Sequence, residues 1–562
     1  MNKKLTKVLS MVLACGMLLS ATACGGGSSN GSSTGGGSVE IDKTVPTGGD
    51  GDAEQTLDIY LLYKGYGDLW LKSAINRFAA QTWVREKYPQ LSINYTFNST
   101  DSHPHQKLTA GASINKYDLM FGVNMQGYES KGVLADLTDS VYLAEVPGEE
   151  GTKVIDKIPQ YALDLVRNAT AEPRADGNDT YMVVSYIKDF WSLMYNADIL
   201  KSMNLEVPLT TDQFLETAET IQTTGYTWAK GEKGYNVLTN RAGANYWRSS
   251  YDLWWSQYEG AEGVSNYYEG YDPLEEQTNS NVVLQQAGRL ESLKVVEAIL
   301  SKYSYSKRDE ANYRVVQTAF LMGDGVFHWN GDYFASEMQT EIDTLKSQGI
   351  NYDIRYMKAP VISAIIQKTP TIKTDAGLRA VIKEIDANIL YADSQAKKNG
   401  VSQADFEIIV EARSFAGLSR VAGQSAIVPS YAAGKAVAAD FLRFMYTEES
   451  IKDFTASSGG IVFPTTHDMA ADQEVYAKIQ PIHQSKLKIM QGTSNYPFTY
   501  SVSAGGTRLG KGGLTSLYYQ GNFEVNFTLP EGSRQSAADI LADEASHWNK
   551  NTWDQMVASA GA

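Results

Sequence analysis

Short apolar runs alternate with helical patterns after residue 55, and this alternation restricts the possible folds more than any other feature. Residues 56–63 (TLDIYLLY) form an apolar run typical of a buried strand, and residues 68–87 have the periodicity of a helix with one apolar face. Residues 91–98 alternate as a second strand, and residues 117–122 predict a third. Alternating strands and helices favour a parallel, doubly wound sheet, so we expect an α/β fold.

The N-terminus has the pattern of an export signal. Three lysines precede the apolar stretch Val8 to Leu19, which is too short to span a bilayer and is typical of a signal peptide. We expect residues 1–23 to be this signal peptide. Residues 24–53 are nearly all Gly, Ser, Thr and Asp, a composition that predicts a flexible linker.

Cys24 lies between these two segments. Ala21, Thr22 and Ala23 lead into it, an arrangement that resembles the bacterial lipobox, in which the cysteine is acylated and becomes the mature N-terminus. The resemblance implies a protein that is anchored to the outer face of the bacterial cell membrane by a lipid on Cys24. The alternative is an ordinary signal peptidase site with a chance cysteine. The chain has only one other cysteine, Cys15, in the segment that would be removed, so we expect no disulfide.

Charge and composition exclude several classes of partner. The net charge of the whole chain is -16, and removal of residues 1–23 takes away three lysines and no acids, which gives -19. We therefore expect no nucleic-acid partner, because phosphates need a basic surface, and no adsorption to anionic lipids. The chain also holds 34 Tyr and 10 Trp, rings that can either bind a ligand or fill a core.

Two short motifs do not predict a cofactor or a metal. Residues 505–513 (GGTRLGKGG) have the glycine and lysine spacing of a nucleotide-binding loop, but Gly512 replaces the hydroxyl residue that would hold magnesium. His103 and His105 have no accompanying cluster of metal ligands. We expect neither a cofactor nor a metal site.

Several longer motifs together carry a family resemblance. They occur in this order: DFWSLMYNADIL (189–200), VPLTTDQFLETAETI (207–221), FLMGDGVFHWNGDYF (320–334) and GGIVFP (459–464). Their order resembles that of the family 1 extracellular solute-binding proteins of carbohydrate ABC importers, which are similar to maltose- and oligosaccharide-binding proteins. The resemblance covers most of residues 56–465.

The resemblance implies a two-lobed periplasmic-binding-protein-like fold of type II. Each lobe would be a mostly parallel sheet flanked by helices, with the ligand in a cleft between the lobes. We expect lobe 1 to comprise residues 55–185 and 356–425. Lobe 2 would comprise residues 186–355 and 426–562, including a C-terminal extension.

The resemblance also implies ligand-binding residues. Asp189 matches an acidic sugar-binding position of related proteins, with a solvent-facing loop carboxylate as the alternative, and Tyr333 replaces a tryptophan that stacks on sugar in the family. The other expected residues adjoin these two or follow the first and third strands: Phe190, Trp191, Lys64, Tyr66, Asn124 and Met125.

The densest group of rings lies in residues 245–271. Trp247, Tyr251, Trp254 and Tyr258 have helical spacing, which indicates a core-facing stripe rather than a binding site. Trp255 lies off this stripe and is the better candidate for a cleft. The other candidates from this region are Tyr246, Tyr267 and Tyr268.

The sequence therefore predicts a solute-binding lipoprotein that captures a carbohydrate, most simply an oligosaccharide, and delivers it to ABC permease subunits. We expect no enzymatic activity. The alternatives are a surface protein that binds or degrades glycans, and a binding protein for a non-sugar solute such as a peptide.

Overall fold

The chain divides into two compact units. The structure is a computed structural model that describes residues 35–37, 55–62, 65–98, 104–123, 128, 131–168, 171, 174–240, 246–306, 312–418, 424–491, 495–499 and 507–561. Unit 1 comprises Met1–Asp189, Ala335–Glu341 and Arg420–Gln480, and unit 2 comprises Phe190–Phe334, Ile342–Ser419 and Pro481–Ala562.

This division differs from the expected lobes mainly after residue 355, and residues 186–189 and 335–341 also belong to unit 1 instead of lobe 2. Residues 356–419 belong to unit 2 instead of lobe 1, and residues 426–480 belong to unit 1 instead of lobe 2. Strand pairing is the reason: β10 (Ile354–Tyr356) pairs with β6 (Trp191–Asn196) in unit 2, whereas β11 (Ser425–Ile427) pairs with β4 (Leu119–Val123) in unit 1. The chain thus returns to unit 1 later than expected.

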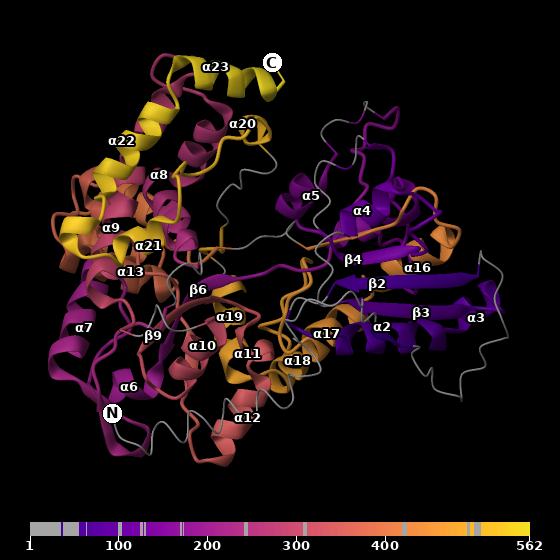
Figure 1. Ribbon diagram of the computed structural model, residues 1–562, viewed down its shortest axis with the longest axis horizontal. Coiled ribbons are helices and arrows are strands. Elements are labelled where there is room, and N and C mark those ends of the chain that lie inside the picture. The colour runs from indigo at the N-terminus through magenta and orange to yellow at the C-terminus, as the bar shows by residue number, and fades with distance from the viewer. Residues whose placement is uncertain are drawn as a thin grey trace. The chain divides into compact units, whose positions relative to one another are not determined.

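Unit 1 is built on a six-stranded sheet with the order β1-β3-β2-β4-β11-β5. The strands not yet given are β1 (Gly35–Gly37), β2 (Thr56–Leu62), β3 (Ser92–Asn98) and β5 (Val184–Ser185). β2 runs parallel to both β3 and β4, which confirms the three predicted strands, and Figure 1 shows these three side by side. β1, β11 and β5 pair in antiparallel fashion with their neighbours.

β1 lies inside the segment expected to be a flexible linker. Gly36 is paired with Thr96 of β3 in antiparallel register. The edge of a sheet presents unpaired backbone groups to any extended chain, and glycine brings no side chain that would obstruct the pairing. These three residues of the linker are therefore a strand; the rest of residues 24–53 lies outside the described residues.

Aromatic side chains from several elements fill the core of unit 1. Trp70 of α2 packs against Phe121 of β4 and against Tyr186, with ring centroids 5.2 and 5.5 Å apart.

The expected helix over 68–87 is interrupted because Gln81 is extended. The helices of unit 1 are α2 (Leu69–Ala80), α3 (Thr82–Lys87), α4 (Pro104–Thr109), α5 (Gln160–Val166), α16 (Lys435–Phe444), α17 (Glu448–Ser457) and α18 (Gln473–Lys478).

Unit 2 contains a three-stranded sheet, β10-β6-β9, and a two-stranded sheet of β7 (Tyr226–Trp228) and β8 (Glu232–Gly234). β6 pairs in antiparallel fashion with both β10 and β9 (Phe327–Gly331). The expectation of a mostly parallel sheet in each lobe is therefore wrong for this unit, and among the described strands of unit 1 only the pairs of β2 with β3 and with β4 are parallel. Alternation of strands and helices gives the element types, but strand direction depends on long-range pairing across more than a hundred residues.

Helices surround the sheets of unit 2. They are α6 (Ala197–Ser202), α7 (Thr211–Thr224), α8 (Arg248–Glu269), α9 (Ala287–Tyr303), α10 (Tyr313–Leu321), α13 (Asp375–Asp386), α14 (Gln395–Lys398), α15 (Gln403–Ser414) and α19 (Pro481–Gln491). The boundary between the units falls within α11 (Phe334–Glu337) and α12 (Gln339–Ser347). The stripe of Trp247, Tyr251, Trp254 and Tyr258 is buried, as predicted.

The C-terminal helices are part of unit 2. They are α20 (Arg508–Lys511), α21 (Phe523–Phe527), α22 (Ala537–His547) and α23 (Lys550–Ser559). Figure 1 shows these yellow helices near α8 and α9: α20 contacts α8, α21 and α22 contact α9, and α23 contacts α20. The buried Arg289 of α9 donates to Glu544 of α22 at 2.6 Å and to the carbonyl of Ser516 at 2.9 Å. The extension is thus held by a buried ion pair as well as by apolar packing.

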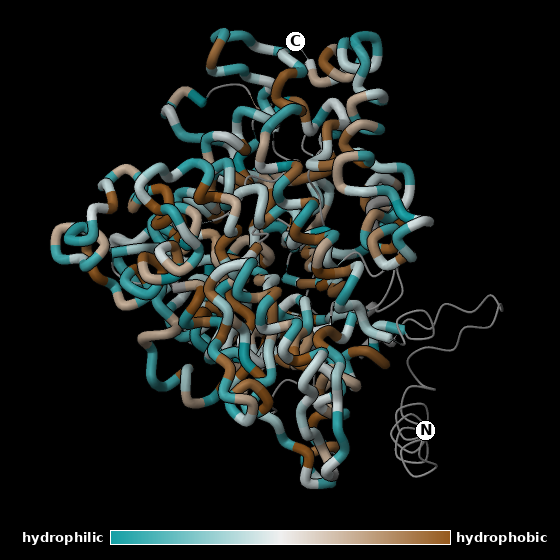
Figure 2. Tube along the Cα trace, turned by 90° about the vertical axis from the view of Figure 1, so that its left-hand side faces the viewer, coloured by the Kyte–Doolittle hydropathy of each residue, from teal (hydrophilic) through white to brown (hydrophobic). Residues whose placement is uncertain are grey.

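Hydrophobic and hydrophilic residues are interspersed along the helices (Figure 2). Among the described residues, none of the helices is long and apolar enough to cross a lipid bilayer.

The buried Arg289–Glu544 pair gives a prediction for stability. In Glu544→Gln the guanidinium stays buried without a counter-charge, so the free energy of unfolding should fall by about 3–5 kcal/mol. Urea denaturation followed by fluorescence measures this change. Glu474→Gln breaks an exposed pair with Lys478 and should leave stability unchanged. Equal effects of the two substitutions would contradict the structural role of the buried pair.

A buried histidine gives a prediction for pH dependence. Burial lowers the pKa of His328 in β9 from 6.5 to about 4. Between these values the unfolded state binds more protons than the folded state, so the unfolding free energy should fall as the pH drops from about 6.5 to about 4, by up to about 3 kcal/mol. His328→Gln should flatten this part of the stability curve. Parallel curves for the two proteins would show that His328 does not titrate in this way.

Candidate ligand-binding site

The first residue of β6 carries a half-buried ring that is fixed from two sides. Trp191 is paired with Gly331 at the end of β9. On its other side Trp191 exchanges two backbone hydrogen bonds with Leu418, at 2.8 and 2.9 Å. Trp191 is half-buried, so part of its indole remains exposed. The backbone that carries this ring is therefore held by two neighbouring strand-like segments.

Gly331 allows the indole of Trp191 to lie directly over the backbone of β9. A Cβ atom at Gly331 would lie 2.6 Å from Cε2 of Trp191, closer than any side chain permits. The carbonyl of Gly331 also accepts a hydrogen bond from the hydroxyl of Tyr356 at 2.7 Å. The absence of a side chain at this one position thus sets where the indole lies.

We call three half-buried residues the aromatic site: Trp191, its contact Tyr246, and Tyr333, which lies close to Gly331 in the chain. The ring of Tyr246, just before α8, meets that of Trp191 edge to face, with centroids 5.4 Å apart. Tyr333 follows two residues after Gly331. All three residues were predicted from the sequence, and their half-buried state leaves ring surface for a ligand.

A buried ion pair lies beside the aromatic site. Asp332, between Gly331 and Tyr333, accepts a hydrogen bond from Nζ of Lys486 in α19 at 3.0 Å, and both side chains are fully buried. Burial raises the pKa of the Asp332 carboxyl, although Lys486 and the backbone N–H of Phe190 oppose the rise. Sequence reasoning missed Lys486, because nothing in the α19 segment indicates a partner 154 residues away.

Four predicted ligand residues are core residues instead. Phe190 is fully buried against Tyr356 and Phe498. Trp255 is 1 % exposed and donates its indole N–H to Gln286 at 2.9 Å, in a core cluster that also contains Tyr267 and Tyr268. The periodicity argument for Trp255 fails because α9 and the C-terminal helices cover a second face of α8.

The remaining predicted residues belong to unit 1 or lie outside the described residues. Asp189 is 5 % exposed, so the alternative of a solvent-facing loop carboxylate is wrong. Tyr66 is buried, and its hydroxyl lies 3.1 Å from that of Tyr186. Lys188, the residue before Asp189, is half-buried, and burial lowers its pKa to about 8. Outside the described residues lie Cys24, Lys64, Asn124 and Met125.

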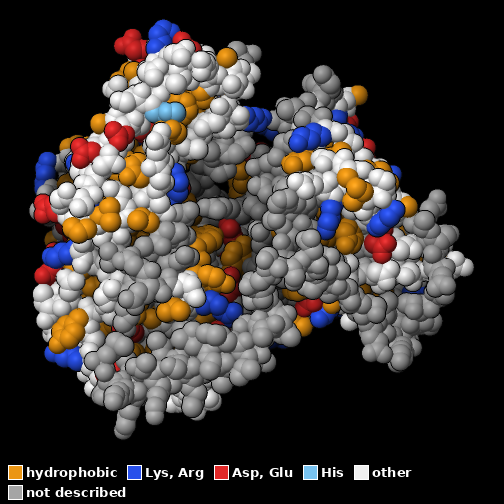
Figure 3. Space-filling model, in the orientation of Figure 1, with side chains coloured by type: hydrophobic (Ala, Val, Ile, Leu, Met, Phe, Trp, Pro, Cys, Tyr) orange, Lys and Arg blue, Asp and Glu red, His pale blue; other side chains and the backbone are white. Residues whose placement is uncertain are grey.

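The glycine-rich motif does not form an open phosphate-binding loop in its described part. Residues 508–511 form the helical turn α20, and the hydroxyl of Thr507 accepts the N–H of Gly510 at 3.3 Å. The described residues hold no group of three or more metal-binding side chains. On the face in Figure 3, basic side chains are scattered among acidic ones.

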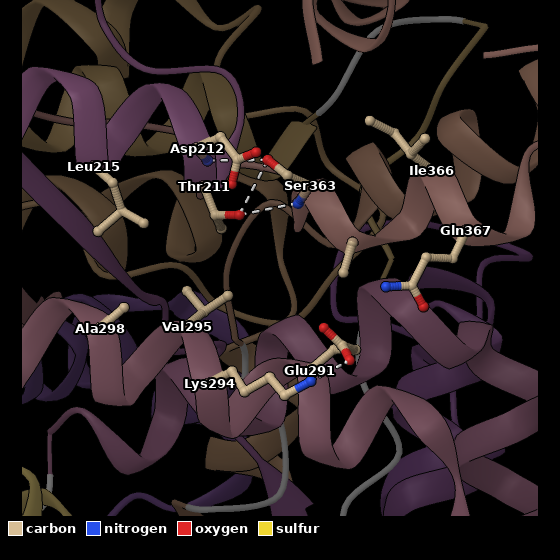
Figure 4. Close-up of a pocket in the computed structure, with 11 residues that line it drawn as sticks. Thr211, Asp212, Leu215, Glu291, Lys294, Val295, Ala298, Ser363, Ile366 and Gln367 are labelled. Carbon is tan, nitrogen blue, oxygen red and sulfur yellow. Dashed lines mark hydrogen bonds and ion pairs between the residues drawn. The ribbon is translucent and has the colours of Figure 1, made fainter. Parts of the chain in front are cut away.

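Unit 2 also has an open groove of about 340 Å³ between α7, α9 and the short helix Ser363–Lys368. Figure 4 shows Thr211 and Asp212 hydrogen-bonded to Ser363 on one wall. On the other wall Lys294 pairs with Glu291 at 2.9 Å. The polar groups of the groove are largely engaged with one another, and no aromatic ring is among its lining residues.

Comparison with known proteins identifies the fold. No protein-family model matches the chain, and no curated protein matches it. Among solved structures, the chain is similar to a probable secreted solute-binding lipoprotein from Streptomyces coelicolor, with 12% identity, coverage of 90% of this chain and 98% of that chain, and a TM-score of 0.51. A chitin oligosaccharide binding protein matches with 14% identity, 89% and 100% coverage and a TM-score of 0.50.

A third structure comes from work on xylan utilisation by the thermophilic bacterium Caldanaerobius polysaccharolyticus, with 13% identity, 90% and 99% coverage and a TM-score of 0.50. Each match extends over nearly the whole of the other chain. The chain therefore has the α/β fold of extracellular solute-binding proteins, as the sequence motifs implied.

Proposed function

We propose that this protein is the solute-binding component of a carbohydrate ABC importer, which binds an oligosaccharide outside the cell and delivers it to permease subunits. The observation that carries the proposal is the aromatic site, in which Trp191 lies over Gly331 and meets Tyr246 edge to face. The fold supports it, because similar chains include a chitin oligosaccharide binding protein.

Half-buried rings suit a sugar for a physical reason. A pyranose has a face of C–H groups that packs on an aromatic ring, while its hydroxyls need hydrogen-bond partners at the edge. Hydrogen bonds to a carboxylate are the stronger kind, which is why an acidic side chain is expected among the ligand contacts. A neutral ligand also fits a chain with a net charge of -16.

Binding without chemical conversion is part of the proposal. Glycoside hydrolysis in most enzyme families uses two carboxyl groups that flank the bond. The acid next to the aromatic site, Asp332, is fully buried and paired with Lys486, so it is not placed to exchange protons with a ligand. A protein that binds and releases its ligand unchanged is consistent with this arrangement.

Screening by thermal shift tests the proposed ligand class. Malto-, xylo- and chito-oligosaccharides and short peptides should be added at high concentration, and a ligand present at a hundredfold excess over its Kd should stabilise the protein by about 2.7 kcal/mol. We expect stabilisation by one sugar series, and chromatography should recover that sugar intact. Stabilisation by peptides alone, or cleavage of the sugar, would contradict the proposal.

Trp191→Ala should weaken sugar affinity by about 2 kcal/mol, roughly thirtyfold, because it removes the largest ring of the aromatic site. Tyr235 is a suitable control because its ring is 46 % exposed elsewhere on unit 2. Tyr235→Ala should bind as the unsubstituted protein does. Calorimetric titration of the unsubstituted protein, Trp191→Ala and Tyr235→Ala measures the three sugar affinities.

We further propose that the mature chain starts at a lipid-modified Cys24 and is tethered by the residues after it. The supporting pattern is the run of small residues before Cys24, behind a basic and apolar signal segment. Cys24→Ser, expressed in a bacterial host, should move the protein from the membrane fraction to the medium or periplasm. An unchanged distribution between fractions would contradict lipid attachment at this residue.

A further inference from the structure

The aromatic site is supported from within unit 2 by α19, a helix that begins 150 residues after Gly331 in the chain. Lys486 reaches from this helix to Asp332, with Nζ and Oδ2 separated by 3.0 Å. One residue earlier, the hydroxyl of Ser485 accepts the backbone N–H of Tyr356 at 2.8 Å. Two consecutive side chains of α19 are therefore bonded to the segments beside the site.

The Asp332 carboxylate ties the end of β9 to α19. Its Oδ2 accepts the hydrogen bond of Lys486, whereas its buried Oδ1 has no hydrogen-bond partner among the described residues. In the chain Asp332 lies between Gly331, over which the indole of Trp191 lies, and Tyr333. The ion pair therefore holds the segment that carries Tyr333 and on which the indole of Trp191 rests.

Tyr356 links the same elements independently. Its hydroxyl donates to the carbonyl of Gly331 at 2.7 Å, and its ring packs edge to face on Phe190 with centroids 5.6 Å apart. The pKa of His483, one turn before Lys486 in α19, is held well below 6.5 by burial and by the Lys486 charge. With His483 neutral, Lys486 supplies the one positive charge of this buried group, and Asp332 supplies its one carboxylate.

A buried ion pair is a weak source of stability, since well-packed neutral residues often serve as well. What a buried ion pair does provide is directionality, because a charged hydrogen bond in a site without water has one favourable geometry. We propose that Asp332 and Lys486 are positioning residues that hold Trp191 and Tyr333 in the arrangement that binds the ligand. The expected effect of the pair on sugar affinity rests on the proposed function. Its expected effect on the positions of the two rings does not.

The chain offers a matched control, because Arg289 and Glu544 form a second fully buried pair in the same unit. Asp332→Asn/Lys486→Met and Arg289→Met/Glu544→Gln each neutralise one pair without leaving an unpaired charge. The probes are maltotriose, xylotriose and chitotriose, titrated calorimetrically. For whichever sugar binds the unsubstituted protein, we expect affinity to fall about tenfold or more in the first variant and to stay unchanged in the second. Equal affinity in both variants would overturn the proposal.

A readout without ligand separates this inference from the proposed function. Labelling with 5-fluorotryptophan gives a ¹⁹F resonance for each tryptophan, and Trp191→Phe identifies that of Trp191. Neutralising the Asp332–Lys486 pair should shift or broaden this resonance, and neutralising Arg289–Glu544 should not. If no sugar binds the unsubstituted protein, the proposed function fails while this spectrum still decides the inference. An unchanged Trp191 resonance would overturn it.

If the doubly substituted protein does not fold, Tyr356→Phe replaces it. This variant removes only the hydroxyl that donates to Gly331, and Tyr267→Phe removes an equivalent buried hydroxyl that donates to Thr515 at 2.8 Å. Tyr356→Phe should disturb the Trp191 resonance and weaken sugar binding about fivefold, while Tyr267→Phe should do neither. The same behaviour in both variants would count against the positioning role.

Discussion

The antiparallel register that sets Trp191 opposite Gly331 is the constraint on which the candidate site depends. It brings the start of β6 and the end of β9 together. A glycine at the paired position then lets the indole lie on the backbone, where any Cβ atom would collide with it. A shift of the register by one residue would turn the indole to the other face of the sheet. The site thus follows from strand pairing.

Charged side chains hold the segments around this strand pair. Burying any one of these charges without its partner would cost free energy of folding. Lys486 and Asp332 are fully buried beside it, and Arg289 and Glu544 are buried where the C-terminal helices meet α9. Each charge is tolerated because its partner is buried with it. Two buried ion pairs consequently attach the C-terminal segment to the rest of unit 2. One of them, through Lys486 of α19, lies next to the aromatic site.

Local features of the structure could be predicted from the sequence. Asn196 ends β6, and its side chain accepts the N–H of Ile199 at 3.0 Å to start α6. Thr210 caps α7, because its hydroxyl accepts the N–H of Gln213, and the side chain of Gln213 accepts the N–H of Leu209. Such short-range patterns depend on neighbouring residues and are therefore readable in one sequence.

Features that depend on distant residues were not predicted. Periodicity separated Trp255 from the buried stripe of α8, but a helix covered on two faces buries both sets of rings. The role of Lys486 and the late return of the chain to unit 1 depend on pairings that no local pattern records. The proposed site depends on the partial exposure of Trp191 and Tyr246. This exposure likewise cannot be predicted from the sequence, because it depends on how the chain packs.

A crystal structure of the protein with a bound oligosaccharide tests the central claim most directly. We expect a sugar ring packed against the exposed part of the Trp191 indole, with Gly331 behind the indole. A sugar bound in the groove between α7 and α9, with the indole of Trp191 free of any ligand contact, would contradict it.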